Sequence, residues 1–462
     1  MRKLKSKEKQ GIAHAIDEEL IQKFYDVLGF ELTAAQQRVL TEIKMDMVSD
    51  KSMQRLLQGD VGSGKTVVAT LACLMAISGG WQVAFMVPTE ILAAQHYENI
   101  KKQIAQIKQW NKKIKVEILT SSLTAVKRKK IYKALEAGKI DLVIGTHALI
   151  QEDLKFNKLG LVVIDEQHKF GVSQRALLPQ KGNNPDVLIM TATPIPRTLS
   201  MTVYGDLDIS TIDELPPGRL PVKTKLYNDD DRQKVYEFIA KKVEEGRQAY
   251  VIYPIIEVSR YVDLKAAEVM YTELKKVFKK FSVGLIHGRL KQKQQDDIMR
   301  SFKAGSTHIL VATSVLEVGM DVPNASVMVI EHAEHFGLSQ LHQLRGRIGR
   351  GNQQSHCLLI ADPKNEAAVA RIKAITKLSD GFAIADEDLH IRGPGEFFGK
   401  RQSGLSELRI ANPLTQMHSL KAAREEAMSL LDQDPSLSQR QHAEIRKLVH
   451  QRFPTYEELM AV

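Results

Sequence analysis

Short apolar runs alternate with helix-like stretches along the first half of the chain. The runs span residues 53–58, 82–87, 116–119, 142–144, 161–164 and 187–190. Runs of this length, rich in β-branched residues, are typical of strands buried on both faces of a parallel sheet. The longer apolar stretch at 67–77 predicts a buried helix. We therefore expect a parallel sheet wrapped by helices.

The alternation stops at a proline-rich segment and then resumes. Residues 213–221 contain three prolines and a glycine, which continue neither a helix nor a strand, and predict a linker. A second series of strand candidates follows at 249–253, 283–286, 308–312, 327–330 and 357–360. From about residue 380 the pattern changes to a Gly- and Arg-rich patch and then to helical sequence. The pattern predicts an α/β protein with two sheets.

The octet at 59–66, Gly-Asp-Val-Gly-Ser-Gly-Lys-Thr, predicts a nucleotide triphosphate site. Its glycines let the backbone N–H groups point inward at phosphate oxygens, and the following helix N-terminus adds partial positive charge. The lysine reaches the β and γ phosphates, and the threonine hydroxyl suits Mg²⁺. The residues expected to contact ATP are Gly59, Gly62, Ser63, Gly64, Lys65 and Thr66. The second half has no such loop, so we expect its lobe to close over a nucleotide held by the first.

Two carboxylates, Asp165 and Glu166, follow an apolar strand about one hundred residues after this loop. The C-terminal ends of strands in an open α/β sheet face the ligand. Asp165 is therefore expected to hold Mg²⁺ together with Thr66, and Glu166 to polarise the attacking water.

Composition limits the class of protein. Sixty-five Lys and Arg against 55 Asp and Glu leave a formal charge of +10, which favours a polyanionic partner. Cys73 and Cys357 lie far apart in sequence, so a disulfide framework is not expected and a reducing cytoplasm fits better. No apolar run approaches the length of a membrane span.

Four motifs together resemble the superfamily-two helicases. They are the phosphate loop, Asp165-Glu166-Gln167-His168, Thr191-Ala192-Thr193 and the Arg- and Gly-rich segment 343–350. The resemblance covers nearly the whole chain. It implies two tandem RecA-like domains that clamp ATP, followed by a small translocation element.

Two further segments are similar to the RecG family of branched-DNA helicases. One is 169–172, directly after the acidic tetrad, and the other is the tail at 386–399 continuing to 401–404. The tail resembles the translocation motif that RecG shares with the transcription-repair coupling translocase. Its Arg-Gly-Pro-Gly sequence is closer to that of RecG. The wedge domain with which RecG splits a branch point has no match here, so the resemblance supports motor chemistry more strongly than junction specificity.

The resemblance assigns nucleotide contacts outside the phosphate loop. Phe30, Thr33 and Gln36 match the adenine-reading motif, in which a Gln amide pairs with adenine and a Phe ring stacks on it. The alternative is an ordinary helix start capped by Thr33. Arg347 and Arg350 match the arginine fingers that neutralise charge on the γ phosphoryl group. Gly319 and Asp321 match the neighbouring motif at the cleft.

The same resemblance implies residues that touch DNA or couple hydrolysis to movement. Loop hydroxyls and N–H groups suit phosphate contacts, which position a strand without reading its sequence. These residues are Thr89, Thr146, Thr191, Thr193, His287, Arg392 and Gln402. Two other signals are discounted: His332, His335 and His342 lack a cysteine partner for a metal, and Phe397 and Phe398 suit packing better than base stacking.

The expected domains are a basic arm at 1–26, an ATP-binding domain at 27–212, a linker at 213–221, a second domain at 222–379 and a translocation element with a helical tail at 380–462. The function implied by the resemblance is an ATP- and Mg²⁺-dependent translocase or helicase on double-stranded and branched DNA, in recombination and repair, with replication or repair proteins as further partners. A coupling-type translocase would need a polymerase-binding module that the sequence does not show. A nucleotide-gated clamp that does not hydrolyse ATP would need neither the water-polarising Glu166 nor the two arginine fingers.

Overall fold

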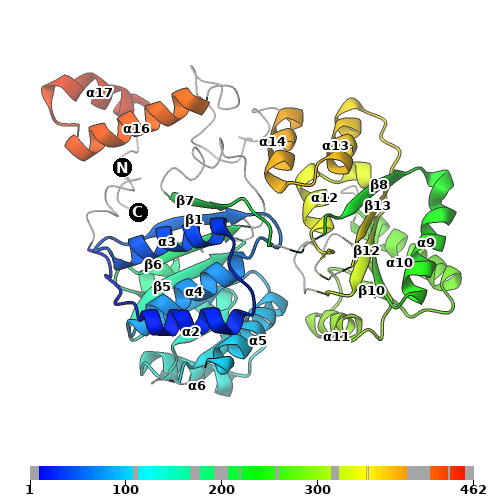
Figure 1. Cartoon of the computed structure of the whole chain (residues 1–462), viewed down its shortest axis with the longest axis horizontal. Helices are drawn as coiled ribbons and strands as arrows, with labels where there is room; N and C mark the ends of the chain where they lie inside the picture. The colour runs from blue at the N-terminus through cyan, green and yellow to red at the C-terminus, as the bar shows by residue number, and fades with distance from the viewer. Residues whose placement is uncertain are drawn as a thin grey trace.

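The computed structural model contains two parallel sheets, each wrapped by helices (Figure 1). It describes residues 10–107, 113–166, 177–191, 207–216, 218, 220–254, 260–313, 322–349, 351, 353–392, 417–434 and 437–452. The expected α/β fold with two parallel-sheet lobes is confirmed.

The first sheet has seven strands in the order β3-β4-β2-β5-β6-β1-β7, and all its neighbours are parallel. The strands are β1 (Gln54–Gly59), β2 (Gln82–Met86), β3 (Val116–Leu119), β4 (Leu142–Gly145), β5 (Leu159–Asp165), β6 (Asp186–Thr191) and β7 (Asp208–Ile212). The helices are α2 (Glu18–Leu28), α3 (Ala34–Val48), α4 (Lys65–Ser78), α5 (Glu90–Gln106) and α6 (Ala125–Glu136).

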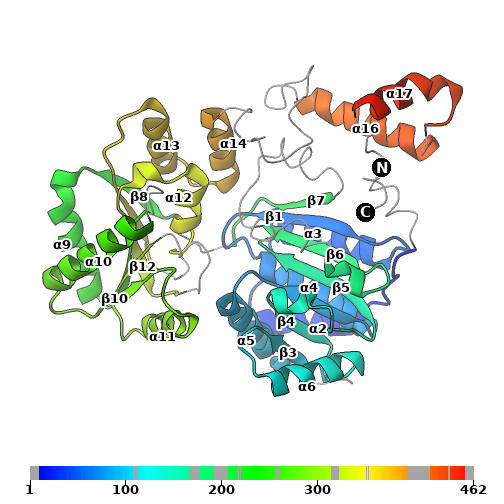
Figure 2. The same cartoon turned by 180° about the vertical axis from the view of Figure 1, so that it is seen from behind.

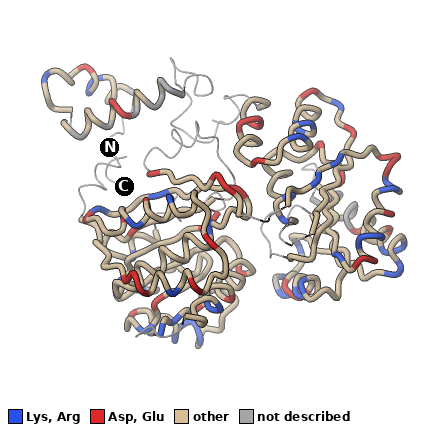
Figure 3. The backbone as a smooth tube through the Cα atoms, viewed as in Figure 1, with Lys and Arg blue, Asp and Glu red and all other residues tan. Residues whose placement is uncertain are grey.

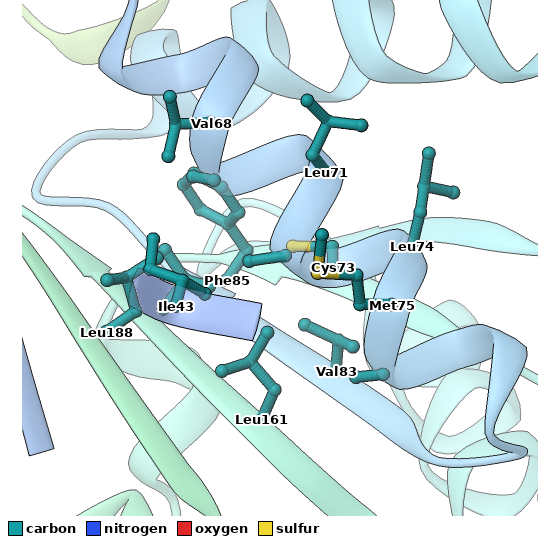
Figure 4. Packing of buried hydrophobic residues seen from close by; sticks show 14 of the residues in the cluster. Ile43, Val68, Leu71, Cys73, Leu74, Met75, Val83, Phe85, Leu161 and Leu188 are labelled. Carbon is teal, nitrogen blue, oxygen red and sulfur yellow. The ribbon is translucent and has the colours of Figure 1, made fainter. Parts of the chain in front are cut away.

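Alternate residues of these strands supply the two cores of the first lobe. Leu57 and Phe85 point into the core formed with α2 to α5, whereas Leu56 and Met86 point into the core on the other face, with Leu135 of α6. Figure 4 shows side chains of α4 lying over the strand residues Phe85, Leu161 and Leu188. The near-continuous apolar runs of the sequence are explained by this burial on both faces.

The second sheet has six parallel strands in the order β10-β11-β9-β12-β13-β8. They are β8 (Lys223–Tyr227), β9 (Gln248–Ile252), β10 (Val283–Ile286), β11 (Ile309–Ala312), β12 (Ala325–Ile330) and β13 (His356–Ile360). Its helices are α9 (Arg232–Glu244), α10 (Arg260–Val277), α11 (Gln292–Lys303), α12 (Leu338–Arg345), α13 (Glu366–Lys377) and α14 (Gly381–Arg392). Further along the described part of the chain lie α16 (Met417–Gln433) and α17 (Ala443–Arg452).

Helix α14 belongs to the body of the second lobe. Ile384 of this helix is buried in the same core as Leu341 and Leu344 of α12 and Ile375 of α13. Helices α9 and α10 pack on the opposite face of the sheet, in a separate core. The translocation-like sequence therefore begins on a helix that is fixed to the second sheet.

The structure contains two strands that the sequence pattern did not indicate. β7 and β8 lie at the ends of their sheets, and most of their residues remain partly or fully exposed. An edge strand has only one neighbour and tolerates polar residues. These two lack an apolar run, whereas β3 and β10 at the opposite edges have one and were expected.

Helix α2 lies partly within the range expected to be a basic arm. Leu20, Ile21 and Phe24 are buried against the first lobe, so packed structure begins before residue 27. Asp17 caps the helix by accepting hydrogen bonds from the backbone N–H groups of Glu19 and Leu20. Among the described residues, no helix has both the length and the apolar character needed to cross a bilayer.

Removing a side chain from the core of α4 should destabilise the first lobe. Leu74 is fully buried, so Leu74→Ala is expected to lower the free energy of unfolding by about 2–5 kcal/mol, through lost burial and a residual cavity. The exposed Val126→Ala on α6 should change it by less than about 0.5 kcal/mol. Both tryptophans, Trp81 and Trp110, fall between β1 and β7, so urea titration followed by tryptophan fluorescence reports on this lobe. Equal midpoints for the two variants would contradict the assignment of Leu74 to the core.

Candidate functional site

The phosphate loop joins β1 to α4 and is shaped by its glycines. Gly62 and Gly64 adopt left-handed φ angles of 77° and 88°, a region that side chains rarely occupy. A Cβ on Gly64 would overlap the Gln36 amide, and one on Gly59 would lie 2.6 Å from Ser63 Oγ. Gly64 caps α4 without a side-chain hydrogen bond, so the first backbone N–H groups of the helix face the loop, as anion binding requires.

Lys65 is folded back on its own loop. Its Nζ donates to the carbonyl oxygens of Gly59 and Asp60 at 2.9 and 2.8 Å, and the residue is 8% exposed. These two carbonyl groups hold the ammonium group at the loop. An incoming phosphate would have to replace these carbonyl groups as the acceptor for the Lys65 ammonium group.

Gln36 connects the start of α3 to the phosphate loop. Thr33 and Gln36 form a capping box, in which Thr33 Oγ1 accepts from the Gln36 N–H and Gln36 Oε1 accepts from the Thr33 N–H. Gln36 Nε2 also donates to the carbonyl oxygen of Ser63 at 2.8 Å. The helix cap foreseen as the alternative is thus present, and the same amide contacts the loop. Phe30 is 50% exposed, so its ring face is accessible.

Asp165 lies at the C-terminal end of β5, on the same sheet edge as the phosphate loop. The strand β6 separates β5 from β1, which places the backbones of Asp165 and the loop roughly 10 Å apart. Asp165 Oδ1 accepts from the Glu166 N–H at 3.0 Å. Glu166 has a φ of 51°, an uncommon conformation for a residue with a side chain.

A histidine that sequence reasoning missed contacts this aspartate. His96 Nε2 lies 3.4 Å from Asp165 Oδ2, and the ring packs on Phe85 with a centroid distance of 5.0 Å. His96 is buried in α5, and nothing in its neighbouring sequence distinguishes it from a core position. It lies beside the carboxylate expected to hold the metal.

The donor atoms at this edge fit Mg²⁺. This ion prefers oxygen ligands and retains several waters, so one or two protein oxygens suffice. The Thr66 hydroxyl begins α4 and the Asp165 carboxylate ends β5, both beside the phosphate loop. These are the residues that would hold the ion.

The second lobe reaches the phosphate loop through Asp60. Asp60 Oδ1 lies 2.6 Å from His342 Nε2 in α12, and Oδ2 accepts from the backbone N–H of Gly381 at 3.0 Å, where α14 begins. Asp60 Oδ1 also accepts from the Val61 N–H at 2.6 Å. Burial raises the pKa of Asp60, but the hydrogen bonds from His342 and the Val61 N–H, together with the Lys65 charge, outweigh it and leave the pKa lowered.

The segment expected to carry the arginine fingers lies against the same loop. A Cβ on Gly346 would lie 2.7 Å from Cβ of Val61, so the lobes approach here to a distance that only glycine allows. Arg347 is the next residue and is partly buried. The tertiary structure thus brings Arg347 beside the phosphate loop.

Three loops at the C-terminal edge of the first sheet are connected by hydrogen bonds. Glu90 accepts from the Ser122 N–H at 3.0 Å, and Ser121 Oγ lies 3.1 Å from His147 Nε2. Thr89 caps α5 by accepting from the Leu92 N–H, and Thr146 is 2% exposed. Ser121 and Ser122 were not singled out in the sequence. Only their position between β3 and α6, next to two loops with matched motifs, points to them.

The other expected residues lie farther from these loops or outside the described part of the chain. Thr191 ends β6 and is buried. His287 follows β10 in the second lobe, accepts from the Arg289 N–H through Nδ1, and has its pKa lowered by burial. Outside the described residues are Thr193, Gly319, Asp321, Arg350, Gln402, Phe397 and Phe398, and the side chain of Arg392.

The three discounted histidines do not converge. His332 and His335 lie 3.8 and 3.7 Å from Glu334, whereas His342 contacts Asp60. The described residues contain no group of three or more His, Cys, Asp or Glu arranged to hold a metal ion.

Comparison with known proteins shows three family matches in order along the chain. Residues 33–202 match the DEAD/DEAH box helicase model, residues 231–352 the helicase conserved C-terminal domain, and residues 378–453 the C-terminal part of domain 3 of ATP-dependent DNA helicase RecG. The third match begins just before α14.

Curated relatives and a solved structure agree with these matches. The chain is 50% identical to the ATP-dependent DNA helicase RecG of Synechocystis sp. over 94% of its own length and 52% of the relative's. It is 47% identical to that of Bacillus subtilis over 96% of its own length and 65% of the relative's. A structure of RecG bound to a three-way DNA junction aligns with a TM-score of 0.76 and 46% identity, over 92% of this chain and 55% of that one. The chain spans roughly half to two thirds of the length of these proteins, and over that span it belongs to the RecG family.

Proposed function

We propose that this chain is an ATP- and Mg²⁺-dependent motor that translocates on double-stranded DNA and acts on branched DNA such as forks and Holliday junctions, in recombination and repair. One observation carries the proposal. The phosphate loop of the first lobe is contacted by Gly346 and His342 of the second lobe and by the first residue of α14. A nucleotide bound there would touch both lobes and lie next to the translocation-like segment.

The residues at the cleft are suited to hydrolysis. Lys65 and the loop N–H groups would bind the phosphates, and Glu166 would orient the attacking water. Mg²⁺, held by Thr66 and Asp165, would neutralise charge on the phosphates. Arg347 and, beyond the described residues, Arg350 would stabilise the charge on the γ phosphoryl group from the second lobe.

The remaining expected residues complete this proposal. Phe30, Thr33 and Gln36 would read adenine, Gly319 and Asp321 would sense nucleotide, and Thr191, Thr193, Arg392 and Gln402 would couple hydrolysis to movement. DNA, contacted without sequence preference, is the proposed partner, with replication or repair proteins as further partners, and the proposed location is the cytoplasm.

The charge distribution supports a DNA path on the first lobe. Residues 101–140 contain twelve Lys and Arg and two Asp and Glu, so this segment carries a net charge of +10, equal to that of the whole chain. Lys and Arg gather around α6 at one end of the sheet (Figure 3), away from β1 and β7 in both views (Figures 1 and 2). Lys127, Lys129 and Lys130 of α6 are exposed. The helix begins at Ala125, three residues after Ser122, so its basic surface lies next to the loop cluster.

ATP hydrolysis should depend on duplex DNA and on Glu166. We expect forked or linear duplex to stimulate the steady-state ATPase rate more than single-stranded DNA. Glu166→Gln should lower that rate on the order of 100-fold or more while ATP still binds, since it removes only the water-orienting group. Lys65→Ala, the companion variant, should weaken ATP binding itself. A Glu166→Gln rate within a few-fold of the parent would remove Glu166 from the mechanism.

Close approach of the lobes at Gly346 should be required for turnover. Gly346→Ala places a methyl group 2.7 Å from Val61 Cβ and displaces Arg347. Because a misplacement of about 1 Å can cost about 100-fold in rate, turnover should fall at least tenfold, with a smaller change in ATP affinity, as in Arg347→Ala. Gly284→Ala in β10, whose added Cβ would meet Thr307 Cγ2 at 3.1 Å, is the control. Parent-like turnover in Gly346→Ala would show that the contact is dispensable.

Neutralising the basic surface of α6 should weaken DNA binding and reduce its salt dependence. Each lost phosphate contact lowers the slope of log affinity against log salt by roughly 0.9, so Lys127→Gln, Lys129→Gln and Lys130→Gln together should lower it by up to about 3. The same change at Lys276, Lys279 and Lys280, exposed on the second lobe, is the matched control. Fluorescence anisotropy with duplexes of unrelated sequence measures the slope. Equal slopes for the two triple variants would place the DNA elsewhere.

A further inference from the structure

The contact at Asp60 is part of a closed ring of hydrogen bonds that joins the phosphate loop to α14. His342 Nδ1 accepts from Arg345 Nη2 at 3.0 Å, which leaves Nε2 to carry the hydrogen donated to Asp60. Arg345 in turn donates to the carbonyl oxygens of Ile375, Leu378 and Ser379, at 2.9, 2.7 and 3.0 Å. These carbonyls lie at the end of α13 and in the turn before α14, and the Gly381 N–H closes the ring on Asp60.

The three side chains of this ring are buried and hydrogen-bonded. Asp60, His342 and Arg345 are 9%, 5% and 5% exposed. A buried carboxylate needs donors to offset its desolvation, and Asp60 receives them from Val61, His342 and Gly381. Two of the three come from the second lobe. Displacing α12 or α14 would leave the charge of Asp60 with fewer donors.

The ring is also connected to the group that would meet the γ phosphate. Lys65 Nζ donates to the main-chain carbonyl oxygen of Asp60, the same residue whose side chain holds α12 and α14. When Lys65 moves from that carbonyl to a phosphate, the main chain of Asp60 loses a charged hydrogen-bond partner. The carboxylate of Asp60 is still held by the second lobe. A change at the nucleotide therefore acts directly on the residue that α14 contacts.

From this geometry we propose that Asp60 is the contact through which the phosphate loop and helix α14 sense one another, with His342 as the residue that positions its carboxylate. The proposal rests on the ATP-driven function above and deepens it. It assigns a physical route from the nucleotide to the translocation-like segment that passes neither through the DNA nor through the linker between the lobes.

Substitutions at His342 and Asp60 test the route. His342→Ala removes both hydrogen bonds of the ring, whereas His342→Gln offers an amide that can donate to Asp60 and accept from Arg345. Asp60→Asn leaves one side-chain oxygen for three donors. His335→Gln, at an exposed histidine of the same lobe, is the matched control.

The first measurement is amide hydrogen exchange in residues 381–392, with and without a non-hydrolysable ATP analogue and Mg²⁺. In the parent we expect the analogue to change the exchange rates of this segment. In His342→Ala and Asp60→Asn we expect this change to be at least about fivefold smaller, because couplings between two binding sites are typically about fivefold or more. His342→Gln should restore part of it. The proposal is overturned if the parent binds the analogue without any change in amide exchange in 381–392. It is also overturned if the exchange response of His342→Ala is as large as that of the parent.

The second measurement is displacement of a triplex-forming strand per ATP hydrolysed. Because it is a ratio, a lower turnover or a less stable fold does not by itself change it. We expect it to fall at least about fivefold in His342→Ala and in Asp60→Asn, and the double variant to be no worse than either, because both act through one contact. Additive losses would overturn the proposal. If the parent hydrolyses no ATP, both the proposed function and this proposal fail. If the parent hydrolyses ATP and all variants keep its ratio of strand displacement to ATP hydrolysed, only the coupling through Asp60 fails.

Discussion

A parallel sheet must be covered on both faces, and this constraint organises the whole molecule. Strands such as β2 are fully buried, and their alternate residues fill two separate cores under two sets of helices. Each helix returns the chain to the same end of the sheet, so every functional loop leaves from one edge. The phosphate loop, Asp165 and the loops after β2, β3 and β4 lie together for this reason.

The buried carboxylate of Asp60 adds the second constraint, because it joins the two lobes at the site of chemistry. It has a lowered pKa despite burial, which means that its donors more than offset the cost of desolvation. Those donors come from α12 and α14 as well as from its own loop. Both lobes therefore meet at the phosphate loop, and Gly346 allows the close approach that accompanies this contact.

Most of the fold could be predicted from the sequence, since buried strands are recognisable as apolar runs bounded by turn residues. The edge strands β7 and β8 could not, because an exposed strand is free to be polar. The packing of α2 was also missed: its sequence follows a lysine-rich start, and only the burial of Leu20 and Phe24 shows that it belongs to the first lobe. For the candidate site, glycine spacing and the acidic strand end were sufficient to locate the phosphate loop and Asp165.

The sequence by itself determined the local chemistry: a loop that only glycines can form, a lysine and threonine placed after it, carboxylates at a strand end, and a segment matching RecG. Only the tertiary structure decided which distant residues meet that chemistry. His96 became a partner of Asp165, and His342, which the sequence offered only as an implausible metal ligand, became a partner of Asp60. The physical reason is that local motifs report backbone shape and side-chain type over a few residues. A contact across 282 positions depends on how two separate sheets dock, and no short pattern encodes that.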